Sequence, residues 1–129
     1  MRTALIWLVT GFGLNLILES PPAFATPAWL FALRVGGFHM LVVGWLTQLI
    51  FGVAYWMFPR RSTEVARGGE WLGWLGYIGL NAGLLGRIAA EPLAPLYGVA
   101  RWALVGSAVA QLFAALALIA LVWGRVRER

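Results

Sequence analysis

The sequence predicts an all-α membrane protein in which residues 1–129 form a single domain, a bundle of four transmembrane helices. The first observation behind this prediction is composition: 61% of the residues are hydrophobic and only 12% are charged. Soluble domains carry about 25% charged residues, and a soluble chain of this composition would expose large apolar patches. The second observation is distribution, because the charged and proline residues divide the chain into four apolar runs.

These runs predict four helices, at about residues 3–19, 30–58, 70–90 and 96–124. A helix needs about 20 apolar residues to cross a hydrocarbon core of about 30 Å. The second and fourth runs satisfy this length easily, and the first and third do so with their flanking residues. Segments rich in proline or arginine, at 20–27, 59–69 and 91–95, separate the helices and form the expected connections.

The arginines predict the orientation of the bundle. With the N-terminus inside, seven of the ten arginines face the cytoplasm: Arg2, Arg60, Arg61, Arg67, Arg125, Arg127 and Arg129. The other three, Arg34, Arg87 and Arg101, face the outside. Because arginine is enriched on the cytoplasmic side of membrane proteins, the N-terminus and the C-terminus are both predicted to be cytoplasmic. The expected location is the cell inner (plasma) membrane, as a multi-pass protein.

The first apolar run has a second interpretation. Arg2, the run itself and Ala23-Phe24-Ala25 resemble a secretory signal peptide with its cleavage site. Cleavage there would leave three spans and would place the two termini on opposite sides of the membrane. We therefore favour a first transmembrane helix and keep the signal peptide as the alternative.

The composition also excludes several classes of function. The absence of cysteine excludes disulfides, iron–sulfur clusters, thiolate metal sites and covalently attached c-type haem. With one histidine and no aspartate, an acid–base or nucleophilic triad cannot be assembled. The net charge of +5 does not indicate a nucleic-acid partner, because the arginines lie at the ends of apolar runs and not on one basic face.

His39 is the only histidine, and it lies five residues after Arg34 in the second expected helix. A rise of about 1.5 Å per residue places it about 7.5 Å deeper than Arg34, within the outer leaflet. An ionisable side chain at that depth usually faces the bundle interior or a cavity. One interpretation is a neutral histidine that hydrogen-bonds between helices, and the other is an axial ligand of haem iron.

The residues that follow His39 favour the haem interpretation. An apolar stretch leads from His39 to Gly52, Tyr55 and Pro59, a Gly-x-x-Tyr-x-x-x-Pro ending. Over roughly residues 34–60, this segment resembles the second transmembrane helix of the catalytic subunit of haem–copper oxidases, and the nitric oxide reductase branch most closely. The resemblance implies that His39 corresponds to the low-spin haem ligand and that the cofactor is haem b.

The chain also departs from that family. The catalytic subunit there has several times as many helices and further histidines, which serve a second haem and a copper or iron centre. A single histidine cannot supply those sites, so the resemblance does not extend to copper-linked oxygen reduction or proton pumping. The family's helices form four-helix arcs with approximate threefold symmetry. This implies a homo-oligomer, with a trimer favoured and a dimer that shares one haem between two His39 side chains as the alternative.

Two further groups of residues are candidates for the haem site. Glycines recur along the third expected helix, and Gly76 and Gly83 could form a flat surface against which a porphyrin lies. The alternative is close helix packing of the small-xxx-small type. Arg87 and Arg101, at outer helix ends, are candidates to pair with haem propionates. Arg34 is a weaker candidate because it points about 140° away from His39 around the helix. All three arginines could instead snorkel to the interface.

Seven other polar residues lie inside the expected helices, and we expect them to hydrogen-bond between helices. They are Thr10, Asn15, Thr47, Gln48, Asn81, Ser107 and Gln111. Gln48 lies about 180° from His39 on an ideal helix, so it is not expected to serve the same pocket.

The leading interpretation is a haem b-binding membrane protein for electron transfer or for binding a diatomic gas such as oxygen or nitric oxide. If it is an enzyme, it is an oxidoreductase. Its partners would be the lipid bilayer, further copies of the chain, and an electron donor or gas.

Two alternatives stay open. A small transporter or channel is disfavoured, because proton-coupled exporters need a carboxylate within the membrane and all five glutamates fall in loops, at helix ends or in the tail. A cofactor-free structural or assembly subunit is compatible with the whole sequence.

Overall fold

The computed structural model describes residues 2–20, 27–57 and 70–126, and every regular element in these ranges is helical. The all-α prediction is therefore confirmed. In chain order the elements are α1 (Arg2–Leu18), α2 (Ala28–Ala32), α3 (Arg34–His39), η1 (Met40–Thr47), α4 (Gln48–Met57), α5 (Glu70–Ala90), η3 (Glu91–Leu93) and α6 (Gly98–Val126). The labels η1 and η3 denote a π-helix and a 3-10 helix.

The second predicted helix is a chain of four segments, from α2 to α4, that follow one another with a single break at Leu33. At Leu33 ψ is 1°, and its backbone N–H donates to Leu30 O at 3.0 Å, three residues earlier. This is the tighter spacing of a 3-10 turn. The helix resumes at once, because Gly37 N–H donates to Leu33 O at 2.8 Å. The helix predicted at 30–58 is thus present over residues 28–57, with a local tightening near its start, and residue 58 lies outside the described residues.

The middle of that helix, η1, has the wider winding of a π-helix over eight residues. The Thr47 hydroxyl follows the same spacing and donates to Val42 O, five residues earlier, at 2.8 Å. Gly44 lies within this segment at a close approach to two neighbouring helices. A Cβ added at Gly44 would lie 2.6 Å from Trp7 Cγ in α1 and 2.8 Å from Leu84 Cδ2 in α5. A glycine is therefore required where three helices meet.

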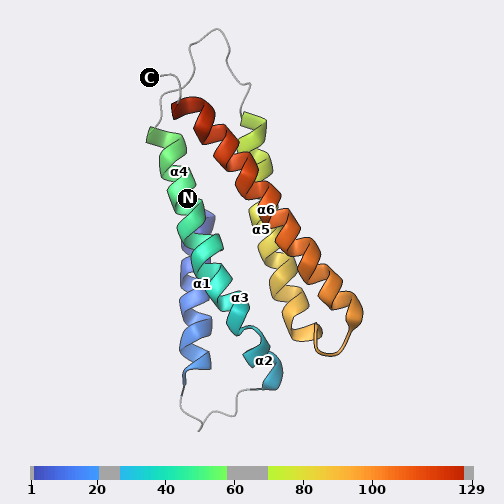
Figure 1. Cartoon of the computed structure of the whole chain (residues 1–129). Coiled ribbons are helices and arrows are strands. Elements are labelled where there is room, and N and C mark those ends of the chain that lie inside the picture. The colour runs from blue at the N-terminus through green and yellow to red at the C-terminus, as the bar shows by residue number, and fades with distance from the viewer. Residues whose placement is uncertain (1, 21–26, 58–69, 127–129) are drawn as a thin grey trace.

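The helices form two antiparallel pairs (Figure 1). In the first pair, α1 packs along α3 and η1; in the second, α5 and α6 pack along each other and make the most extensive contact in the molecule. The two pairs meet mainly where η1 and α3 contact α5 and where α4 contacts α6. The buried core is small and centres on Leu80, Ala114 and Leu118, with Val43 and Phe51 packed against it.

The exterior of the bundle is strongly apolar. Large hydrophobic side chains are exposed on every long helix, among them Val9, Leu16, Trp56, Trp74 and Trp102. Two helical stretches in the described ranges are long and apolar enough to cross a membrane: Trp29–Met57 and Gly98–Trp123. The apolar α1 is shorter, at 17 residues. The 21 residues of α5 include glycine, tryptophan and tyrosine, which carry little hydropathy, and α5 does not meet the same criterion.

Candidate functional site

His39 is the last residue of α3, directly before the π-helical segment. Its side chain is half-buried, and its Nδ1 lies 3.0 Å from the backbone oxygen of Val35, one turn earlier. Because a carbonyl oxygen only accepts hydrogen bonds, Nδ1 is the protonated nitrogen in this contact. The neighbouring Val35 and Phe38 are exposed, and the Phe38 ring stands edge-on to the imidazole with ring centroids 6.3 Å apart. The imidazole thus lies beside the outer surface of the bundle.

The three arginines predicted to face outside differ in what they contact. Arg34 forms an ion pair with Glu19 at 2.7 Å, and both side chains are 67% exposed. Exposed pairs of this kind contribute little to stability, so Glu19 does not hold the Arg34 guanidinium firmly. Arg101 is exposed and donates from Nε to the backbone oxygen of Ala94 at 3.3 Å. Its role toward a propionate stays a prediction.

Arg87 is in a different environment, because it forms a mostly buried ion pair with Glu91. Arg87 Nε lies 2.8 Å from Glu91 Oε1, and the two side chains are only 18% and 6% exposed. The second carboxylate oxygen, Oε2, is buried without a hydrogen-bond partner in the described structure. It lies against Gly36, where an added Cβ would be 2.6 Å from it. The charge of Arg87 is thus already balanced within the chain, although the sequence suggested it for a propionate.

Gly76, Gly79 and Gly83 of α5 face α6. A Cβ at Gly76 would lie 2.4 Å from Leu118 Cγ, and one at Gly83 would lie 2.7 Å from Gln111 Cγ and 3.1 Å from Ser107 O. Helix α6 therefore fills the space in which a porphyrin would have to lie against these glycines. The packing interpretation of Gly76 and Gly83 accounts for both residues in this arrangement.

Of the seven polar residues expected to bond between helices, three do so. Ser107 donates to Gly83 O across the α5–α6 contact, and Gln48 and Asn81 join α4 to α5. The other four bond within their own helices: Thr10, Asn15, Thr47 and Gln111. The expectation was wrong for these four because each side chain finds a partner on its own helix. Thr10, Asn15 and Thr47 donate to a backbone carbonyl three to five residues earlier, and Gln111 donates to the Ser107 hydroxyl four residues earlier.

Gln48 and Asn81 belong to a longer chain of hydrogen bonds through the bundle. The Thr3 hydroxyl donates to Gln48 Oε1 at 3.2 Å, and Gln48 Nε2 donates to Asn81 Oδ1 at 3.1 Å. Trp7 Nε1 also donates to Asn81 Oδ1, at 2.8 Å, while Asn81 Nδ2 donates to Tyr77 O at 2.7 Å. Since an indole N–H is only a donor, Asn81 must present its oxygen to Trp7. Gln48 must then turn its nitrogen toward Asn81, so the orientation of both amides is fixed.

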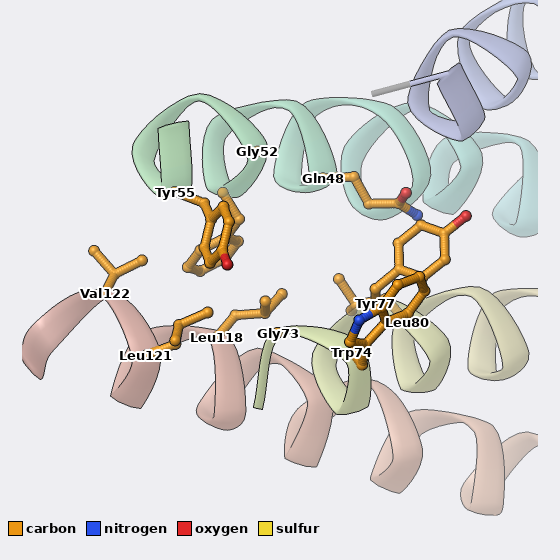
Figure 2. A pocket seen from close by; sticks show the side chains of 11 residues that line it. Gln48, Gly52, Tyr55, Gly73, Trp74, Tyr77, Leu80, Leu118, Leu121 and Val122 are labelled. Atoms are coloured by element: carbon orange, nitrogen blue, oxygen red, sulfur yellow. The ribbon is translucent and has the colours of Figure 1, made fainter. Parts of the chain in front are cut away.

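A cavity of about 400 Å³ lies beside this hydrogen-bond chain, between α4, α5 and α6. Gln48 lies at one end and Tyr55 nearer the other, with Trp74 and Tyr77 reaching in from α5 and Leu121 lining the side of α6 (Figure 2). The lining residues are Gln48, Phe51, Gly52, Tyr55, Gly73, Trp74, Tyr77, Leu80, Leu118, Leu121 and Val122, and none of them carries a formal charge. His39 does not line this cavity, so the structure has two separate regions of functional interest.

Sequence reasoning missed the cavity and the burial of Glu91. The second had a readable signal, because Arg87 and Glu91 stand four residues apart, the spacing at which opposite charges pair on a helix. The cavity had no such signal in the sequence, because it depends on the distance of α4 from α5 and α6.

The comparisons with known proteins give no further identification. No family model, no curated protein and no solved structure matches this chain.

Proposed function

We propose that this protein spans the membrane four times with both termini cytoplasmic, and that it binds haem b through His39 for electron transfer or for binding a diatomic gas. The observation that supports the proposal best is the 3.0 Å contact between His39 Nδ1 and Val35 O. Histidines that bind metals characteristically donate their second ring N–H to a carbonyl or carboxylate, which orients the ring and raises its basicity. With Nδ1 donating to Val35 O, Nε2 is the ring nitrogen left to bind iron.

The position of His39 indicates where the haem would lie. Val35 and Phe38, which precede it on α3, are 51% and 62% exposed, so this face of α3 lies on the outside of a single chain. A haem held there has apolar protein on one face only. A second copy of the chain would cover the other face, which supports a homo-oligomer.

The surrounding charge is compatible with a haem whose propionates reach the outer surface. Arg34 and Arg101 are exposed and lie near the helix ends predicted to face outside. Charge-assisted hydrogen bonds from such guanidinium groups stabilise carboxylates. Arg87 ranks behind them, because its ion pair with Glu91 is mostly buried, whereas the ion pair of Arg34 with Glu19 is exposed.

The oligomer decides the chemistry that the haem would supply. A two-fold contact that brings two His39 side chains to one iron occupies both axial positions and suits electron transfer. A three-fold ring gives one histidine to each haem and leaves a position for a gas.

The test is an absorption spectrum of the detergent-purified protein from haem-replete cells, oxidised and then dithionite-reduced, with a pyridine haemochrome assay. We expect a Soret band and a b-type haemochrome in the wild type and their loss in His39→Gly. Imidazole added to His39→Gly should restore the band, because free imidazole replaces the missing ligand. Thr10→Ala, whose hydroxyl bonds only within α1, is the control and should keep the haem.

Carbon monoxide then separates the two arrangements, since it shifts the spectrum of a reduced haem with an open position and leaves a bis-histidine haem unchanged. A colourless wild-type protein, or a His39→Gly variant that keeps its haem, would overturn the proposal in favour of a cofactor-free subunit or a transporter.

A further inference from the structure

We infer that the cavity between α4, α5 and α6 is a second binding site, for a neutral, lipid-soluble molecule with a flat aromatic or quinonoid ring that bears a carbonyl group. Membrane quinones belong to this class. The inference does not depend on haem, because His39 does not line the cavity.

The size and walls of the cavity define the ring. Small-molecule sites have volumes of about 300–1,000 Å³ and mostly apolar linings, and this cavity is about 400 Å³. Four of its lining residues are aromatic: Phe51, Tyr55, Trp74 and Tyr77. Aromatic side chains contact a flat ring through offset-stacked or edge-to-face arrangements, so a planar ligand makes better use of these walls than a branched one.

The absence of charge and the exposure of the mouth define the solubility of the ligand. No lining residue carries a formal charge, and a charged ligand would lose its hydration without a counter-charge to replace it. Trp74 is 64% exposed and Tyr77 is 37% exposed, so the cavity opens to the exterior of the bundle. That exterior is apolar, which favours entry from a lipid phase.

Gln48 defines the polar group of the ligand. Its side-chain oxygen accepts from Thr3, and one amide hydrogen is donated to Asn81. The second amide hydrogen has no acceptor among the described residues, although Gln48 is only 9% exposed. Leaving a buried donor unpaired is unfavourable, and a ring carbonyl would accept this hydrogen. A simple acyl chain would fill the apolar walls but would leave the donor unpaired.

Glycine keeps the cavity open on the α5 side. A Cβ at Gly73 would meet only Leu121 Cδ2 at 3.4 Å and Tyr55 at 4.0 Å, which are ordinary contacts. A larger side chain at this position can therefore enter the cavity without displacing the backbone. Gly73→Leu is the variant that fills the site. Gly86→Leu is the matched control on the same helix, because nothing lies within 4 Å of a Cβ at Gly86.

The experiment is calorimetric titration of the full-length protein in detergent with decylubiquinone and, separately, with an alkylbenzene of the same chain length. In the wild type we expect saturable binding of the quinone and about tenfold weaker binding of the alkylbenzene, because it lacks the acceptor for Gln48. For the quinone, we expect loss of saturable binding in Gly73→Leu and wild-type binding in Gly86→Leu.

Each opposite result would overturn the inference. Quinone binding that never saturates shows partition into micelles, and equal binding of the alkylbenzene shows a site for hydrocarbon chains. Equal weakening by Gly73→Leu and Gly86→Leu shows a site elsewhere. The comparison of the two ligands uses the wild-type protein, so it stays decisive even if Gly73→Leu does not fold. The haem spectrum is recorded separately, so a failure of either proposal can be assigned to its own site.

Discussion

The contact between α5 and α6 differs sharply from the contact of these two helices with α4. Along the first, Gly76, Gly79 and Gly83 bring α5 so close to α6 that an added Cβ would lie 2.4–2.9 Å from the nearest α6 atoms. Along the second, Gly73 belongs to the same glycine series but lines a cavity. The same residue type, one turn apart on one helix, thus closes one interface and leaves the other open. The function of a glycine depends on the distance to the neighbouring helix, which its own spacing does not specify.

The largest expected effect comes from breaking the close interface. Gly83→Val should lower the free energy of unfolding by about 3 kcal/mol, because the new side chain meets Ser107 O and the base of the Gln111 side chain and forces the two backbones apart. Unfolding by sodium dodecyl sulfate, followed by circular dichroism, measures the change. Gly86→Val is the control, with open space around it. A similar loss in both variants would show that helix propensity, and not the close contact, is responsible.

An intermediate effect is expected from breaking the hydrogen bonds beside the open interface. Asn81→Leu keeps a similar volume but removes the acceptor of Trp7 Nε1 and Gln48 Nε2. Two interhelical hydrogen bonds in a membrane protein contribute about 1–2 kcal/mol together, and we expect that loss in the same unfolding assay. Asn15→Leu should cost less, because Asn15 bonds within its own helix. The comparison fails if the two variants are equally destabilised.

The smallest effect on stability is expected from adding a single Cβ atom at an open and at a close-packed position of α5. Gly86→Ala adds a Cβ in open space and should raise stability by up to about 1 kcal/mol, because alanine has the higher helix propensity. Gly79→Ala adds the same atom 2.9 Å from Ala114 Cβ and should lower stability instead. Thermal melts of the two variants, measured together, give the sign of each change. Two changes of the same sign would contradict the assignment of Gly79 to the close contact.

The helices themselves were predictable from the sequence. The third helix, Glu70–Ala90, has the predicted range 70–90, and α6 begins and ends two residues later than expected. These helix ends could be predicted because proline and charged residues lie close to them in the sequence, and such residues end a helix through local effects. The four-span topology and its orientation stay predictions.

The arrangement of the side chains was less predictable. Gln48 was not expected to serve the same pocket as His39, and this is confirmed, because Gln48 lines the cavity and His39 does not. The angle of about 180° behind that expectation assumed 100° per residue, a rate that η1, between the two residues, does not follow. Glu91 stands at a helix end in the sequence, yet α3 covers it through Gly36. The burial of Glu91 depends on this contact between helices, which no local pattern reports.

The π-helical segment also has a consequence for how the longest apolar helix is organised. Because its backbone winds more widely than the α-helices on either side, α3 and α4 are out of phase with each other. Their shared axis therefore presents one set of side chains around His39 and an angularly shifted set around Gln48. In a single continuous α-helix, the number of residues between His39 and Gln48 would fix the angle between the directions of their side chains. The wider turns of η1 change this angle. The side chains around His39 and those around Gln48 can therefore face different neighbours, each suited to its own site.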